Sequence, residues 1–319
     1  MLGCIDLGSN SFHLLIAEPN DGGYKVVERL SEKVQLGESL GATGKITSQS
    51  FERGLACLHR FNVLMRQYPL QRYWALGTNA FRTADNAKDF IRSAKAVGID
   101  MSVISGFQEA TLIYTGVLTA LPKSRVHRLV FDIGGGSTEV VVGKNHNRLL
   151  AESLPIGSVA WRDRFFSGAG YSKAELASQM SEASEEAFSV FSAIASGIVS
   201  VGWKEAYGSS GTIKMLANIC EEYGCGQRQV ELEALLRLKQ EMVDLICAEQ
   251  EIPGLKERRR DLLLPGWCIM VGLMRAYGIE KIQFSPAALR EGMLDIMLKN
   301  GQTRQIMRSS GLPEVSYAK

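Results

Sequence analysis

Residues 131–143 read FDIGGGSTEVVVG, three glycines between two runs rich in apolar and β-branched residues. RLVFD (128–132) leads into the glycines and EVVVG (139–143) leaves them, which predicts a strand, a tight turn and a second strand. A third strand, NRLLAESLP (147–155), follows the polar turn KNHN. The stretch therefore predicts a strand–turn–strand unit with a third strand beside it, and not a flexible linker.

The same pattern occurs near the N-terminus, where residues 5–17 read IDLGSNSFHLLIA. Aligned without gaps at an offset of 126 residues, the two copies match Asp6 with Asp132, Gly8 with Gly134, and Ser11 with Ser137. A third strand, YKVVERLSEKVQL (24–36), follows this copy too. Because an internal repeat decides an architecture more firmly than any single motif, the sequence predicts two lobes of similar build.

Helical patterns fill most of the remaining chain, which places it in the α/β class. They are predicted at Ser48–Tyr68, Ala84–Val97, Gln108–Leu121, Ser172–Ile198, Gly211–Tyr223, Glu231–Glu251 and Leu262–Tyr277. Gly98 fits a glycine that ends a helix. No low-complexity tract separates the halves, so we expect an N-terminal lobe at 1–125 and a C-terminal lobe at 126–319, whose last helix has room to pack back on the first lobe.

Composition excludes several classes of protein. Hydrophobic residues make up 45% and charged residues 22%, as in soluble globular proteins, and a net charge of +2 gives no general field for nucleic acid. The apolar stretch Leu262–Met274 is too short to span a bilayer, and the N-terminus has no secretory pattern. Six cysteines without a C-x-x-C pair predict reduced, mostly buried thiols in a cytoplasmic protein without a Cys/His zinc site.

Two further fragments suit phosphate. LGTNAFRTADN (76–86) follows a short strand with small polar residues and Arg82, and YGSSGTIKML (207–216) is a Gly/Ser turn before a helix. Helix N-termini, consecutive backbone N–H groups and arginine all attract anions. Any one fragment is equally an ordinary turn or cap, but four such loops together favour a phosphate site.

Taken in order, these segments resemble the exopolyphosphatase / guanosine pentaphosphate phosphohydrolase (Ppx/GppA) family of the actin–sugar kinase–Hsp70 superfamily. The resemblance runs from residue 4 to about 294 and includes IDLGSNSFHLLIA, EKVQLGESL, GTNAFRTADN, ISGFQEATLIYTGV, FDIGGGSTEVVVG, LPIGSVAWRDRF, GSSGTIKML and SPAALREGML. It implies two ribonuclease H-like, actin-like ATPase lobes with a cleft between them. Many members continue into a helical C-terminal region, so this chain resembles the short two-domain form.

Hydrolysis of a phosphoanhydride requires neutralised phosphoryl charge and an oriented water. Carboxylate oxygens suit Mg²⁺ or another divalent cation, and Asp6 and Asp132 occupy matching places in the repeat. The resemblance adds Glu139 as a third ligand of metal or water, although His13 stands at its place in the first copy. An aspartate can also simply cap a turn, and Glu139 can be a solvated strand residue, but the symmetric placement of Asp6 and Asp132 favours a functional role.

The resemblance also assigns a catalytic base. SGFQEA is similar to a Ser-Gly-x-x-Glu-Ala signature whose glutamate is here Glu109, while Gln108 stands where members often carry a second acid. A first-turn glutamate stabilised by the helix dipole is the simpler alternative. The turns and the resemblance together predict phosphate binding at Ser9, Asn10, Ser11, Asn79, Arg82, Gly134, Gly135, Gly136, Ser137, Thr138, Ser210 and Gly211.

Three functions are therefore open. The first is a Mg²⁺-dependent hydrolase that releases terminal phosphate from polyphosphate or guanosine pentaphosphate, the second a kinase of the same superfamily, and the third a non-catalytic (p)ppGpp-binding regulator. Retention of Glu109 and of the aspartates favours the hydrolase. The sequence predicts no nucleic-acid partner and no stable membrane association, and leaves open a homodimer, the preferred substrate and chain length, and whether Lys256–Arg260 contacts substrate; a solvated helix start is the simpler interpretation of those residues.

Overall fold

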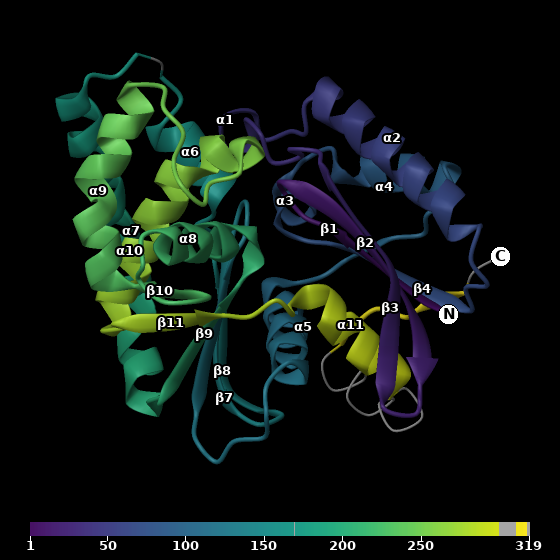
Figure 1. Ribbon diagram of the computed structural model, residues 1–319. Helices are drawn as coiled ribbons and strands as arrows, with labels where there is room; N and C mark the ends of the chain where they lie inside the picture. Colours follow the sequence, from purple (N-terminus) through teal and green to yellow (C-terminus); the bar gives the residue numbers. More distant parts are fainter. Residues whose placement is uncertain (169, 300–310, 318–319) are drawn as a thin grey trace. The chain divides into compact units, whose positions relative to one another are not determined.

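The computed structural model describes residues 1–168, 170–299 and 311–317. Residue packing divides the chain into two compact units, and each is treated separately below (Figure 1). Unit 1 comprises Met1–Thr119 and Ala287–Lys319, and unit 2 comprises Ala120–Pro286. The lobe limits expected from the sequence, 1–125 and 126–319, stay a prediction.

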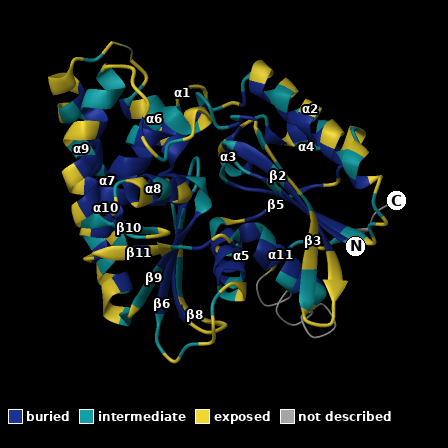
Figure 2. Cartoon of the chain, in the orientation of Figure 1, coloured by how far each residue is buried: buried dark blue, intermediate teal, exposed yellow. Residues whose placement is uncertain are grey.

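Unit 1 is built on a mixed sheet with strand order β12-β4-β1-β2-β3, to which β5 adds on β4. β1 runs antiparallel to β2 and parallel to β4, and β3 forms the exposed outer strand (Figure 2). The strands are β1 (Leu2–Leu7), β2 (Ser11–Asn20), β3 (Gly23–Lys33), β4 (Arg72–Gly77), β5 (Ser102–Val103) and β12 (Ser316–Tyr317).

The helices of unit 1 cover both faces of this sheet. α2 packs with α4 over one face, where they share a core with β1 and β2, whereas α11 packs on β1 and on α5 at the other (Figure 1). The helices are α1 (Leu40–Thr43), α2 (Ser48–Met65), α3 (Asn79–Thr83), α4 (Ala87–Ala96), α5 (Gly106–Thr119) and α11 (Leu289–Leu298).

Unit 2 has a second mixed sheet with strand order β10-β11-β9-β6-β7-β8. Its strands are β6 (Arg128–Ile133), β7 (Thr138–Lys144), β8 (Asn147–Leu154), β9 (Glu205–Ser209), β10 (Gln229–Glu231) and β11 (Lys281–Phe284). One apolar core joins the sheet to α6 (Ser158–Phe165), α7 (Lys173–Val201), α8 (Ser210–Glu222), α9 (Leu232–Cys247) and α10 (Leu263–Tyr277), with the 3₁₀ helix η1 (Glu257–Leu262) before α10.

The internal repeat is present in the strand pairing as well as in the sequence. Asp6 pairs with His13 across β1 and β2, and Asp132 pairs with Glu139 across β6 and β7. Each first strand also has a parallel neighbour, β4 in unit 1 and β9 in unit 2. The α/β class and the two similar sheets predicted from the repeat are therefore confirmed.

Most predicted helices are present with shifted ends. The prediction of one helix from Ala84 to Val97 is wrong at its start, because Ala84 has extended backbone (φ −78°, ψ 129°) and separates α3 from α4. Gly98 follows α4 with φ 89°, as its place after a helix predicts. Within the described residues, no helix combines the length and apolar character needed to cross a membrane.

Candidate active site

The first candidate turn, Gly8–Ser11, is held from behind by the segment after β3. The Gly8 N–H donates to the Ser11 carbonyl (3.2 Å) and so closes the turn. The Ser9 carbonyl accepts from the Gly37 N–H (2.8 Å). The Asn10 carbonyl accepts from the backbone N–H groups of residues 34 and 35, at 3.0 and 2.8 Å. The turn therefore has its carbonyl oxygens engaged by protein.

The glycine turn of unit 2 is built the same way. The Gly134 N–H donates to the Ser137 carbonyl (2.9 Å), which repeats the Gly8–Ser11 bond at the offset of the sequence repeat. The carbonyls of this turn accept hydrogen bonds from the first turn of α6. The Ser158 N–H donates to the Gly134 carbonyl (2.9 Å), and the Val159 N–H donates to the Gly135 carbonyl (2.8 Å). A β-carbon at Gly157, just before α6, would overlap the backbone of the glycine run, so α6 reaches this close only with glycine there.

These bonds set the direction of the N–H groups in both turns. In a planar trans peptide, the carbonyl of one residue and the N–H of the next point in opposite directions. Because the carbonyls of Ser9, Gly134 and Gly135 face the supporting segments, the N–H groups of Asn10, Gly135 and Gly136 point away from them. Successive N–H groups that point the same way, such as those of Gly135 and Gly136, form a concavity that binds anions. The two turns are thus suited to phosphate oxygens.

Serine hydroxyls orient the carboxylates of unit 2. The Ser209 hydroxyl donates to Asp132 Oδ2 (2.6 Å), and the hydroxyls of Ser137 and Ser153 both donate to Glu139 Oε1 (2.8 Å). Glu139 is only 1% exposed, so its interpretation as a solvated strand residue is wrong. Ser137 therefore contacts a candidate metal ligand directly, whereas the buried Thr138 donates its hydroxyl to the Ile156 carbonyl (2.6 Å) and supports the fold.

Each unit offers carboxylate oxygens, the kind of ligand that a hard divalent cation prefers. Asp6, half-buried at the end of β1, is the carboxylate of unit 1, as Asp132 and Glu139 are those of unit 2. Among the residues that the structure describes, no donor reaches the buried Asn10 Oδ1, which suits an oxygen that accepts from a metal-bound water. Within 1–168, 170–299 and 311–317, no single group of three or more metal-ligating side chains occurs.

Glu109 is buried at the first turn of α5 and contacts Arg82 of α3. Arg82 Nη1 lies 2.6 Å from Glu109 Oε2 and 3.1 Å from the Ile104 carbonyl, with side chains 19% and 10% exposed for Arg82 and Glu109. This ion pair with Arg82 thus fixes the position of the Glu109 carboxylate. Asn79, also predicted to bind phosphate, opens α3 and accepts the Thr83 hydroxyl at its backbone carbonyl (3.0 Å).

Gln108, at the position where the resemblance suggests a second acid, makes three hydrogen bonds with definite partners. Its Oε1 accepts from the Ser105 N–H (2.8 Å) and its own N–H donates to Ser105 Oγ (3.2 Å), a reciprocal cap at the start of α5. Its Nε2 donates to the Gly311 carbonyl (2.5 Å). A carboxylate would keep the cap but has no N–H to give, so the amide ties the C-terminal segment to the helix that carries Glu109.

We expect Gln108→Glu to release Gly311 while α5 keeps its cap. Backbone N–H groups of 311–317 should exchange with solvent at least about tenfold faster, since a hydrogen bond of ~1.4 kcal/mol is lost. Hydrogen exchange followed by mass spectrometry measures this, with 106–112 as the internal control. Equal protection of 311–317 in both proteins would show that the amide bond does not hold the segment.

The Ser210–Gly211 turn opens α8 beneath an arginine that the sequence did not assign to the site. Ser210 adopts φ 97°, strained for a residue with a side chain, and its hydroxyl accepts from the Ile213 N–H (3.3 Å). A β-carbon at Gly211 would overlap the guanidinium of Arg259, so the arginine side chain lies directly against this turn. Burial, and secondarily the neighbouring Arg258, lowers the pKa of Arg259, against the opposing effect of Asp261.

The interpretation of Lys256–Arg260 as a solvated helix start is therefore wrong for Arg259. Its guanidinium lies at the N-terminus of α8, where helix dipole and cation both favour an anion. The sequence did contain a signal for a buried cation, because the basic run Lys256–Arg260 precedes an apolar helix. Nothing in the pattern distinguished Arg259, which faces inward, from its basic neighbours.

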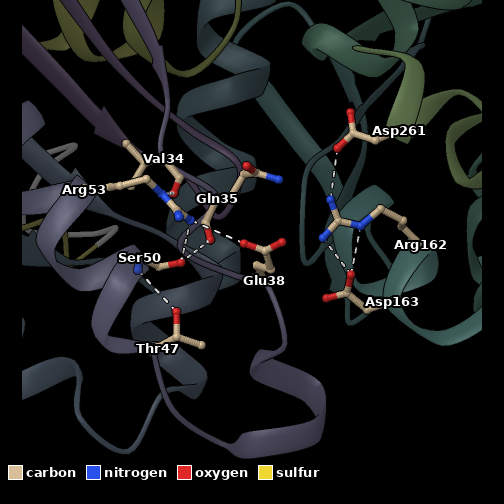
Figure 3. A network of polar contacts seen from close by, with 9 residues as sticks. All are labelled: Val34, Gln35, Glu38, Thr47, Ser50, Arg53, Arg162, Asp163 and Asp261. Atoms are coloured by element: carbon tan, nitrogen blue, oxygen red, sulfur yellow. Dashed lines mark hydrogen bonds and ion pairs between the residues drawn. The ribbon is translucent and has the colours of Figure 1, made fainter. Parts of the chain in front are cut away.

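Two more arginines that the sequence analysis missed stabilise the segments that support the Gly8–Ser11 turn and the glycine turn of unit 2 (Figure 3). In unit 1, Arg53 donates to the Val34 carbonyl (2.9 Å) and to Ser50 Oγ (2.8 Å), and so fixes the segment that supports Gly8–Ser11. In unit 2, Arg162 of α6 binds Asp163 (2.7 Å) and Asp261 of η1 (3.0 Å). It thereby links the helix that supports the glycine turn to the segment that carries Arg259.

Comparisons with known proteins show the family and the fold of the chain. Residues 15–301 match the model of the Ppx/GppA phosphatase family. The chain is 32% identical over 311 residues to a putative exopolyphosphatase of Haemophilus influenzae, covering 97% of this chain and 95% of that protein. It is 38% identical over 299 residues to a guanosine-5'-triphosphate,3'-diphosphate pyrophosphatase of Pseudoalteromonas translucida, covering 92% of this chain but only 58% of that protein.

A solved structure, an exopolyphosphatase from Cytophaga hutchinsonii, superposes with a TM-score of 0.81 at 28% identity, covering 94% of this chain and 98% of that one. The fold is thus the two-lobed, actin-like α/β fold that the repeat and the resemblance predict.

Proposed function

We propose that this chain, which belongs to the Ppx/GppA phosphatase family, is a divalent-cation-dependent hydrolase that releases the terminal phosphate of polyphosphate, of guanosine pentaphosphate or of both. The observation that carries the proposal is the Arg82–Glu109 contact, because it fixes a buried carboxylate beside a loop suited to phosphate. The similar proteins named for both substrates support the substrate class.

Each group has a role in this reaction. Glu109 accepts the proton of the attacking water, and Arg82 holds the carboxylate in place and faces the phosphoryl charge. N–H groups of Asn10, Gly135 and Gly136, with the hydroxyl of Ser11, bind phosphate oxygens.

Other groups complete the site. Ser210, Gly211 and Arg259 are also suited to phosphate oxygens. Asp6, Asp132 and Glu139 would hold Mg²⁺, which neutralises charge on the phosphates when bound. We place this activity in the cytoplasm, where hydrolysis of guanosine pentaphosphate would take part in the stringent response.

The two relatives are named for different substrates, so both substrates belong in the test. The relative matched over nearly its whole length is named for polyphosphate, whereas the one named for guanosine pentaphosphate is matched over 58% of its length. The fuller match to the first relative makes polyphosphate the better-supported substrate of this chain.

Phosphate release from short polyphosphate, long polyphosphate, guanosine pentaphosphate and ATP, each with and without Mg²⁺, tests the proposal. We expect Mg²⁺-dependent orthophosphate from at least one of the first three and little from ATP. Consumption of ATP only when a sugar or carboxylate acceptor is added would indicate a kinase. Tight binding of guanosine pentaphosphate without phosphate release would indicate a regulator.

A further inference from the structure

Helix α8 ends in a loop that places two cysteines side by side. Gly224 adopts φ 71°, its N–H donates to the Glu221 carbonyl (3.0 Å), and the Cys225 N–H donates to the Cys220 carbonyl (2.8 Å). This pair of bonds defines the Schellman motif, in which the side chains of the first and last residue usually pack against each other. In most proteins that pair is apolar, and here both members are thiols.

The surroundings of the two thiols differ. Cys220 is fully buried, whereas Cys225 keeps 8% exposure and receives a hydrogen bond from Arg237 Nη2 on its sulfur (3.2 Å). Burial, and next the neighbouring Cys225, raises the pKa of Cys220 to about 11, in keeping with their closeness. A cation next to the sulfur is typical of reactive cysteines, so Cys225 is suited to react first with an oxidant. The buried Cys220 is suited to react second.

We propose that Cys220 and Cys225 are a modification site at which hydrogen peroxide forms an intramolecular disulfide across the end of α8. The hydrogen bond from the Cys225 N–H to the Cys220 carbonyl (2.8 Å) draws the two ends of this short loop together, as a disulfide between them requires. The inference is independent of the proposed hydrolase activity, since neither cysteine belongs to the candidate active site.

The reaction proceeds in two displacements. The Cys225 sulfur attacks one peroxide oxygen, the O–O bond breaks, and the departing hydroxide leaves as water with the thiol proton, giving a sulfenic acid. The Cys220 sulfur then attacks the Cys225 sulfur, the S–O bond breaks, and a second water leaves with the Cys220 proton. Two thiols are oxidised to one disulfide while one peroxide is reduced to two waters.

Peroxide titration of the native protein, followed by thiol blocking and peptide mass mapping, tests the site. We expect the peptides containing residues 220 and 225 to lose two hydrogen atoms before any other cysteine is modified. Cys247 is the internal control, because it is more exposed than Cys225 and also lies near a cation, Lys173, but its sulfur hydrogen-bonds to the Tyr171 carbonyl (3.6 Å) instead of receiving an arginine N–H. Oxidation of Cys247 first, or of Cys225 to sulfinic acid with Cys220 still reduced, would overturn the proposal.

Three variants separate the roles of the groups. Cys220→Ser should leave a sulfenic acid on Cys225 that dimedone traps, and Cys225→Ser should give neither adduct nor disulfide. Arg237→Gln should slow disulfide formation on the order of tenfold while the same disulfide still forms. An unchanged rate in Arg237→Gln, with circular dichroism equal to wild type, would contradict the role of the guanidinium.

Discussion

Glu109→Gln lowers kcat by about 10²–10⁴-fold and leaves the substrate dissociation constant nearly unchanged, if Glu109 is the base. Glutamine keeps the size of the side chain and can still accept from Arg82, so the 2.6 Å contact has a neutral replacement. It has no basic carboxylate, and we expect other groups to make the phosphate contacts. Turnover and dissociation constants for the best substrate of the panel separate the two effects.

Asp132→Asn is the matched comparison, because it replaces another site carboxylate by its amide. We expect it to raise both the Mg²⁺ requirement and the apparent dissociation constant, since it alters a group expected to hold the cation. Near-wild-type turnover in Glu109→Gln would show that another group removes the proton. The same loss of binding in both variants would place Glu109 among the metal ligands.

Gly116→Ala destabilises unit 1 by about 3 kcal/mol and lowers its apparent melting temperature by about 6 °C. A β-carbon at Gly116 of α5 would overlap the Ala288 carbonyl, and one at Gly292 of α11 would overlap the Leu112 carbonyl. The obstructing atoms are backbone, so the two helices have to move apart. This loss exceeds the ~1 kcal/mol that alanine gains over glycine in a helix.

Gly197→Ala in α7 is the control for helix propensity. Its β-carbon would meet Leu150 Cδ1 at 3.4 Å, an ordinary contact, so we expect equal or slightly greater stability. Thermal unfolding followed by circular dichroism measures both variants. If Gly116→Ala melts with the control, α5 and α11 are not held together by this close approach.

The architecture could be predicted from the sequence, because the two copies of the repeat each contain two strands, a turn and an acidic residue at the same relative positions. The pairing of Asp6 with His13 and of Asp132 with Glu139 follows from a turn of equal length in both copies. Short helices were missed for a physical reason. α3 and α6 are too short to show a period, and they form because tertiary bonds such as Ser158 N–H to Gly134 satisfy their first turns.

The candidate site was only partly predictable. Small-residue turns and carboxylates have sequence signatures, but their supports do not. Arg53, Arg162 and Arg259 each lie in a polar context that most often means solvent, and only the folded chain shows that their guanidinium groups bond or pack inward. The pairing of Arg82 with Glu109 joins residues 27 positions apart, which no local pattern encodes.

Unit 1 consists of two stretches of chain with all of unit 2 between them. A ribosome therefore completes unit 2 before it delivers α11 and β12. Until then α5 lacks the helix that packs at Gly116, and β4 lacks the strand that pairs at Arg72 on the side away from β1. Domains usually finish folding in the order of their synthesis, and we therefore expect unit 2 to complete its fold before unit 1. We therefore expect chaperones that act during translation to bind residues 1–119, which wait longest for their missing neighbours.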